Sequence, residues 1–72
     1  MKVLIIEDEN LIAKNLVRLL TEAAPDAEVL AVISTVDGAV KWLTENPAPD
    51  LLFMDIQLSD GVSFDILTRV KV

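Results

Sequence analysis

Short, almost wholly apolar runs alternate along this chain with longer segments in which apolar residues recur every three or four positions. Three such runs cover residues 3–6, 28–33 and 51–54, and each is bounded by polar residues. Runs of this length that are rich in Val, Ile and Leu are typical of strands buried on both faces. The pattern therefore predicts three core strands.

The segments between these runs have the spacing of amphipathic helices. The first predicted helix covers residues 10–23 and ends at Pro25-Asp26, with an apolar stripe formed by Ile12, Leu16, Leu19, Leu20 and Ala23. A capping box of Ser34 and Asp37 is expected to open the second helix, which closes at Asn46-Pro47. Its apolar stripe consists of Val36, Ala39, Val40 and Leu43.

A third helix is indicated by Phe64, Leu67 and Val70, after a polar segment at residues 57–61. The order is then strand, helix, strand, helix, strand, helix, with short connections. That order is typical of an α/β fold in which a parallel sheet is covered by helices on both faces, with right-handed crossovers. Neither an internal repeat nor a long linker divides the chain, so we expect a single domain.

The amino-acid composition excludes several kinds of functional site. The 72 residues include neither cysteine nor histidine, which excludes disulfides, thiolate or imidazole metal sites and the usual general base. The net charge is −6 and the six basic residues are scattered, so no surface for nucleic acid is expected. No apolar run reaches the roughly 18 residues of a membrane span, and no secretory signal is evident, so a cytoplasmic location is expected.

Three carboxylates stand at strand ends. Glu7 and Asp8 follow the first strand and Asp55 follows the third. In open parallel sheets ligands bind beyond the carboxyl ends of the strands, and if these two strands are neighbours the three acids meet there. Because like charges in proximity repel, a divalent cation would stabilise the group, and Mg²⁺ prefers such oxygen ligands. Asp55 could then act as a nucleophile toward phosphorus.

Acids at strand ends and before helices are also common as solvated residues favoured by the helix dipole. Glu9 fits that simpler interpretation, as a first-turn acid of the first helix. Asp55 does not, because it directly follows an apolar strand and converges with two other acids. We therefore favour a functional site.

These residues resemble the receiver domain of two-component response regulators. The resemblance rests on Ile-Ile-Glu-Asp-Glu at residues 5–9 and on Asp-Leu-Leu-Phe-Met-Asp-Ile-Gln-Leu-Ser-Asp-Gly at residues 50–61. It implies a flavodoxin-like doubly wound parallel sheet, truncated after the third strand and third helix. Residues 1–72 would form a partial receiver, and the rich 53% hydrophobic content agrees with a missing remainder.

The resemblance also implies residue roles. Asp55 would be the phosphoacceptor, taking a phosphoryl group from a sensor histidine kinase, and Mg²⁺ would be bound by Asp8, Glu7, Asp55 and the backbone carbonyl of Gln57. Asp60-Gly61 matches the turn into the third helix. Glu7 replaces the Asp often found there. The Ser or Thr after strand four and the Lys after strand five have no counterpart, so the 72 residues alone are not expected to switch.

Three other classes of protein share some of these features. A Rossmann nucleotide site would need a glycine-rich turn after the first strand, but the glycines of this sequence are Gly38 and Gly61. A haloacid-dehalogenase-type phosphatase would need an Asp at position 57, where this chain has Gln57. The stronger rival is a receiver-like interaction module that is not phosphorylated, with Trp42, Phe53 and Phe64 on its surface, although aromatic residues are more often part of the core. The preferred interpretation is a signalling phosphoacceptor that assists its own phosphoryl transfer, not an enzyme.

The motifs are similar to those of regulators with a downstream LytTR-type DNA-binding domain. Contact with DNA, and hence transcription control, would then require that domain. A third strand with an unpaired edge also leads us to expect self-association of the 72-residue chain.

Overall fold

The computed structural model describes residues 1–55, 57–58, 60–62 and 64–70. Its main sheet has three parallel strands, β1 (Lys2–Ile6), β2 (Glu28–Ile33) and β3 (Leu51–Met54), in the order β2-β1-β3. Three helices, α1 (Asn10–Ala23), α2 (Val36–Glu45) and α3 (Phe64–Arg69), follow the strands in turn. The predicted order of elements and the parallel sheet are confirmed.

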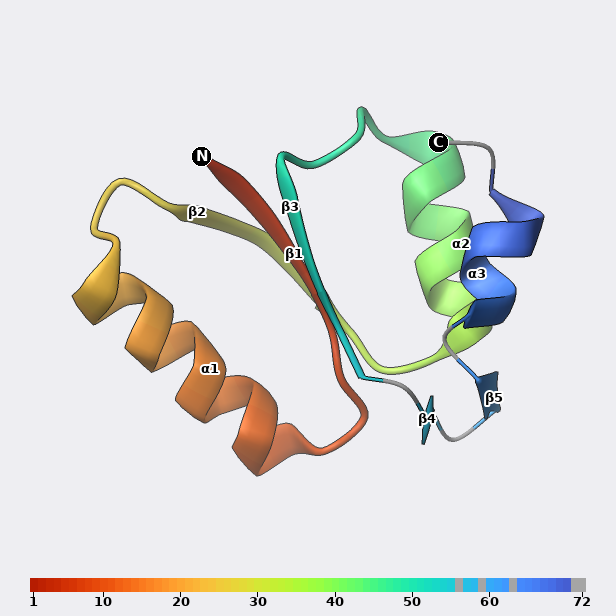
Figure 1. The fold of residues 1–72 in the computed structure, drawn as a ribbon, viewed down its shortest axis with the longest axis horizontal. Coiled ribbons are helices and arrows are strands. Elements are labelled where there is room, and N and C mark those ends of the chain that lie inside the picture. The colour runs from red at the N-terminus through yellow and green to blue at the C-terminus, as the bar shows by residue number, and fades with distance from the viewer. Residues whose placement is uncertain (56, 59, 63, 71–72) are drawn as a thin grey trace.

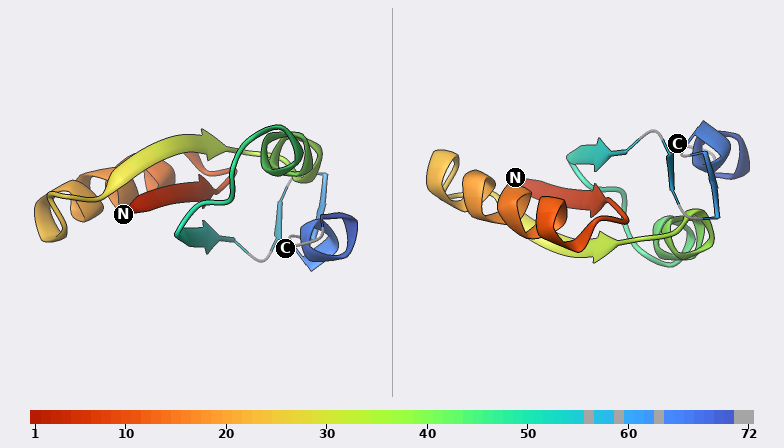
Figure 2. Two further views of the ribbon diagram at one scale, coloured as in Figure 1. Left: turned by 90° about the horizontal axis from the view of Figure 1, so that it is seen from above. Right: turned by 90° about the horizontal axis from the view of Figure 1, so that it is seen from below.

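The helices cover both faces of the sheet, as predicted. α1 lies on one side, whereas α2 and α3 lie together on the other (Figure 1). Views from above and below show the two short strands β4 (Gln57–Leu58) and β5 (Gly61–Val62) beside α3, at the opposite end of the molecule from α1 (Figure 2). This antiparallel hairpin was not predicted, because two-residue strands carry no recognisable alternation.

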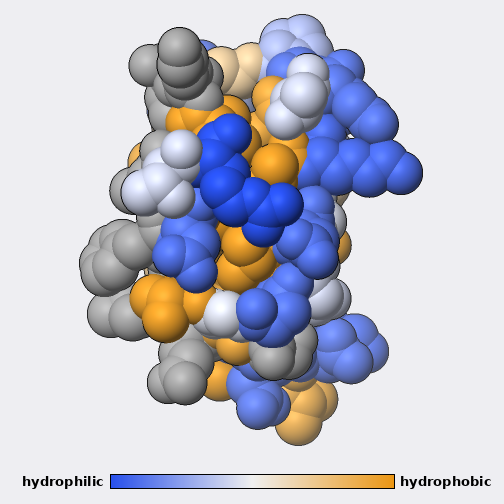
Figure 3. Space-filling model, turned by 90° about the vertical axis from the view of Figure 1, so that its right-hand side faces the viewer, coloured by the Kyte–Doolittle hydropathy of each residue, from blue (hydrophilic) through white to orange (hydrophobic). Residues whose placement is uncertain are grey.

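The centre of the fold is β1, in which Val3 to Ile6 are completely buried. Successive side chains of a strand point to opposite faces, so β1 contributes to the packing on both sides of the sheet. Leu4 and Ile6 belong to a core cluster on the side of α2 and α3, which also contains Val36, Ala39, Leu58 and Ile66. Seen from that side, hydrophobic surface is interspersed with hydrophilic side chains (Figure 3).

The stripe predicted for α2 is confirmed, since Val36 and Ala39 are buried and Val40 and Leu43 pack against the core cluster. Trp42 also packs there, which agrees with a core role. The side chain of Phe64 lies outside the described residues.

The stripe predicted for α1 is partly wrong. Ile12 and Leu19 are 55% and 53% exposed, and the buried position is Ala13. Ala13, Leu16, Val17 and Leu20 are the buried or half-buried apolar residues, at the i, i+3, i+4, i+7 spacing of one helix face. Apolar residues surround much of α1, so periodicity alone does not select the face that meets the sheet.

Two helix starts also differ from expectation. Thr35, not Ser34, caps α2, because the Thr35 hydroxyl accepts a hydrogen bond from the Gly38 N–H at 3.0 Å. Glu9 is the residue just before α1, not a member of its first turn, and its side chain makes no capping bond. Among the described residues, no helix is both long and apolar enough to cross a membrane.

Candidate functional site

The main chain fixes where the strand-end acids lie. β1 pairs with β3 in parallel, with Ile6 opposite Met54, so the two strands are the neighbours that the site requires. The hydrogen-bond ladder continues one residue further on each side of β1. The Asp55 N–H donates to the Ile6 carbonyl at 2.9 Å, and the Glu7 N–H donates to the Ile33 carbonyl at 2.8 Å. Backbone pairing thus holds both acids at the same edge of the sheet.

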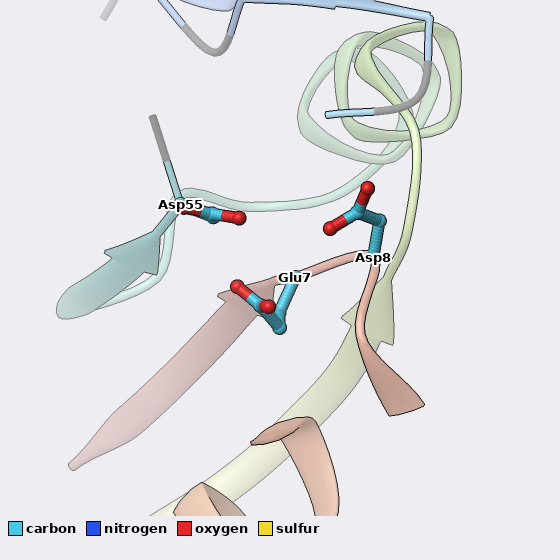
Figure 4. A group of neighbouring side chains, drawn as sticks. All are labelled: Glu7, Asp8 and Asp55. Atoms are coloured by element: carbon cyan, nitrogen blue, oxygen red, sulfur yellow. The ribbon is translucent and has the colours of Figure 1, made fainter. Parts of the chain in front are cut away.

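The three carboxylates converge at this edge. Glu7, Asp8 and Asp55 each offer an oxygen, and these oxygens all lie within 4.8 Å of one another. Asp55 enters from the end of β3, while Glu7 and Asp8 come from the connection between β1 and α1 (Figure 4). All three residues are half-buried, so the group is partly accessible to water.

The electrostatics of the group are unfavourable when all three acids are charged. Burial, followed by the nearby Asp55 charge, raises the pKa of Glu7 above its usual range, against a backbone hydrogen bond from Glu9 that lowers it. The Glu9 N–H lies 3.4 Å from a Glu7 carboxylate oxygen, which is a long contact. Within the described residues, the ion pair formed by a basic side chain joins Arg69 to Asp37, and none reaches the three acids.

A divalent cation fits this donor set. Carboxylate oxygens are the ligands that Mg²⁺ and Ca²⁺ prefer, and Mg²⁺ commonly uses one or two carboxylates and keeps several waters. Adjacent ligands of an octahedral Mg²⁺ ion are about 3.0 Å apart and opposite ones about 4.2 Å apart, given metal–oxygen distances of about 2.1 Å. The carboxylate oxygens of the three acids, all within 4.8 Å of one another, lie close to this spacing.

The fourth predicted ligand is less well defined. Gln57 lies in β4, two residues beyond Asp55, where it pairs with Val62. Its side chain lies outside the described residues, and the role of its carbonyl oxygen remains a prediction. A hollow of about 170 Å³ next to the acids includes Glu7 and Asp55 in its lining, together with apolar residues of β1, β3 and α1.

Asp60 has a contact that the sequence did not predict. Its carboxylate accepts hydrogen bonds from the N–H groups of Val36 at 2.7 Å and Asp37 at 3.2 Å, at the start of α2. These bonds lower the pKa of Asp60, the Val36 bond most strongly. The partners are more than 20 residues away in the chain, so no local motif reveals them.

The predicted turn at Gly61 is confirmed. Gly61 has a φ of +155°, which residues with a side chain rarely adopt. The glycine therefore lets the chain turn back through β5 toward α3.

Comparison with known proteins gives one family. Residues 3–72 match the model of the response regulator receiver domain. Two proteins named sensory transduction protein LytT, from Bacillus anthracis and Bacillus cereus, are 35% and 34% identical over 71 residues, covering 99% of this chain and 28% of each relative. The phyllosphere-induced regulator PhyR of Methylorubrum extorquens is 44% identical over 62 residues, 86% of this chain and 22% of that protein.

The chain thus spans less than a third of the length of these relatives. No solved structure gave a significant match.

Proposed function

We propose, from the premise that this chain belongs to the response regulator receiver domain family, that Asp55 accepts a phosphoryl group in a Mg²⁺-dependent reaction. The observation that carries the proposal is the convergence of Glu7, Asp8 and Asp55. A single strand-end acid would have an ordinary explanation, but three from two neighbouring strands form a ligand set with a nucleophile in it.

The chemistry follows from the carboxylate of Asp55. One of its oxygens attacks the phosphorus of a phosphorylated donor, forming a new O–P bond. The bond between phosphorus and the donor atom breaks, and the donor leaves with its electron pair. The product is an acyl phosphate on Asp55.

Glu7 and Asp8 act with Asp55 in this reaction by holding the cation, and we assign the Gln57 carbonyl as a further ligand. The bound ion supplies positive charge that offsets the charges of the carboxylate and the phosphoryl group. The raised pKa of Glu7 indicates a carboxylate whose charged form a nearby cation would stabilise.

The natural donor, in this proposal, is the phosphohistidine of a sensor histidine kinase, and the location is the cytoplasm. Two of the matched relatives are named as sensory transduction proteins. We extend this to a protein in which a LytTR-type DNA-binding domain follows the receiver and transcription is the output. DNA would be contacted by that domain, not by the acidic surface described above.

Labelling with a small phosphodonor tests the proposal. The full chain is incubated with radiolabelled acetyl phosphate, with Mg²⁺ or with a chelator, as wild type and as Asp55→Asn. We expect labelling of the wild type in Mg²⁺ alone, and none of Asp55→Asn.

Asp50→Asn is the matched control. Asp50 precedes β3, at the end opposite Asp55, and its carboxylate accepts a hydrogen bond from the Lys2 N–H at 2.8 Å. This variant should be labelled like the wild type. Labelling of Asp55→Asn, or labelling that needs no divalent cation, would refute the proposal. A wild type that takes no label would favour an interaction module that is not phosphorylated.

A further inference from the structure

The segment after Asp55 is anchored to α2 by a side chain. The chain passes through β4, turns at Asp60 and returns through β5. At this turn the Asp60 carboxylate accepts the N–H groups of Val36 and Asp37, at 2.7 and 3.2 Å. One carboxylate therefore joins the turn of the hairpin to the first turn of a helix that begins 24 residues earlier.

These bonds complete a closed ring of backbone segments and hydrogen bonds that includes Glu7 and Asp55. The Asp55 N–H is hydrogen-bonded to the Ile6 carbonyl, and the N–H of Glu7, the residue after Ile6, is hydrogen-bonded to the Ile33 carbonyl. Ile33 is three residues before Val36, and the Val36 N–H is hydrogen-bonded to the Asp60 carboxylate. Asp60 in turn is five residues after Asp55, which closes the ring. Two links of this ring are main-chain hydrogen bonds of the sheet, and only the third depends on a side chain.

Asp60 also caps α2, because the Thr35 hydroxyl accepts only the Gly38 N–H of the first turn and the Val36 and Asp37 N–H groups bond to Asp60. Unlike Thr35, Asp60 comes from a distant part of the chain. Arg69 of α3 forms an ion pair with Asp37 at 2.9 Å, which links the same helix start to α3. Neither the Thr35 bond nor the Arg69 ion pair holds the β4–β5 hairpin, which follows Asp55 in the chain. The Asp60 bonds do, because Asp60 lies in the turn of that hairpin.

We propose that Asp60 is a positioning residue for the site, which holds the backbone of Gln57 beside the carboxylates by tying the β4–β5 turn to the start of α2. This inference rests on the proposed function, because it assigns Asp60 an effect on the cation and the phosphoryl group. Asp60 itself touches neither.

The Mg²⁺ affinity of the chain distinguishes a positioning role of Asp60 from a contribution to stability alone, which would leave that affinity unchanged. Mg²⁺ binding is measured by calorimetry on the full chain, at a temperature at which circular dichroism shows each variant to be folded. Asp60→Ala should bind Mg²⁺ about tenfold more weakly, the lower end of the effect of supporting residues at metal sites, and should be labelled more slowly in the same proportion. Asp60→Asn should recover most of the affinity, since its amide oxygen can still accept the Val36 N–H.

Asp50→Ala is the matched control, because it also removes a carboxylate that accepts a distant backbone N–H, but at the far end of β1 and β3. Its Mg²⁺ affinity should stay within about twofold of wild type, well below the roughly tenfold or greater loss expected for a supporting residue of a metal site. Equal affinity in Asp60→Ala and wild type would overturn the inference, as would an equal loss in Asp50→Ala.

Hydrogen exchange in the wild type gives a test that needs no variant. Mg²⁺ should slow exchange of the Val36 amide and leave that of the Lys2 amide unchanged, because only the first belongs to the ring. Unchanged exchange at Val36 on saturation with Mg²⁺ would contradict the inference. A wild type that neither binds Mg²⁺ nor accepts phosphate would instead refute the proposed function, so the two failures are distinguishable.

Discussion

Replacing Asp8 by Asn should stabilise the protein when Mg²⁺ is absent. Asp8 has two carboxylate neighbours, and the ligand oxygens of the three acids lie within 4.8 Å of one another. Two unit charges at that distance repel by about 0.9 kcal/mol in water and about 3.5 kcal/mol at an effective dielectric constant of 20. The group is half-buried and salt screens it, so we take about 1 kcal/mol for each pair. Asp8→Asn removes two pairs and should raise the free energy of unfolding by no more than about 2 kcal/mol.

Mg²⁺ should remove the difference in stability between Asp8→Asn and wild type. An ion that binds only the folded state stabilises it by about 2.7 kcal/mol when present at about 100 times its dissociation constant. The wild type should gain that amount, whereas Asp8→Asn, which has lost a charged ligand, should gain little. The advantage of the variant in chelator should therefore disappear in Mg²⁺.

Urea unfolding followed by the fluorescence of the single tryptophan, Trp42, measures both effects. Glu22→Gln is the control, since it removes one exposed negative charge near the end of α1, away from the acidic group. It should shift stability by no more than a few tenths of a kcal/mol, as surface substitutions usually do, and its response to Mg²⁺ should equal that of wild type. An Asp8→Asn variant that is no more stable than wild type in chelator, or equal stabilisation of both proteins by Mg²⁺, would refute mutual repulsion among the three acids.

Two further predictions concern α2. Gly38→Ala should destabilise the fold by about 1 kcal/mol, because the added Cβ would lie 2.8 Å from the Thr35 hydroxyl oxygen and displace the cap. A double-mutant cycle with Thr35→Ala tests this cause. Additive losses of free energy of unfolding in the two single variants would contradict it. The stability that Asp60 contributes should be constant above the ordinary carboxyl pKa of 3.8 and should be lost as the pH falls through its lowered pKa in the folded state. Urea unfolding of wild type and Asp60→Asn at a series of pH values measures this, and a difference between them that is the same at every pH would exclude the mechanism.

Much of the fold could be predicted because its signals are local. The three apolar runs coincide with β1, β2 and β3, and Pro25 and Pro47 lie just beyond the ends of α1 and α2. The convergence of Glu7, Asp8 and Asp55 followed from a rule about parallel sheets, given one assumption, that β1 and β3 are neighbours. The strand pairing confirms that assumption, and the family match confirms the resemblance to receivers.

The remaining features depend on distant contacts or on choices that the sequence leaves open. α1 carries apolar residues around much of its circumference, so the exposure of Ile12 and Leu19 could not be read from periodicity. Ser34 and Thr35 are both suitable caps, and the structure selects Thr35. The role of Asp60 depends on partners that only folding brings close.

The central claim is that Asp55 carries the phosphoryl group, and chemical trapping tests it most directly. An aspartyl phosphate is an activated acyl group, which borohydride reduces to the alcohol, so that the modified residue becomes homoserine. The full chain is treated with acetyl phosphate and Mg²⁺, reduced, digested and mapped by mass spectrometry. Homoserine at position 55, and its absence when Mg²⁺ is chelated, is the predicted result. Homoserine at another aspartate, with Asp55 intact, would contradict the account.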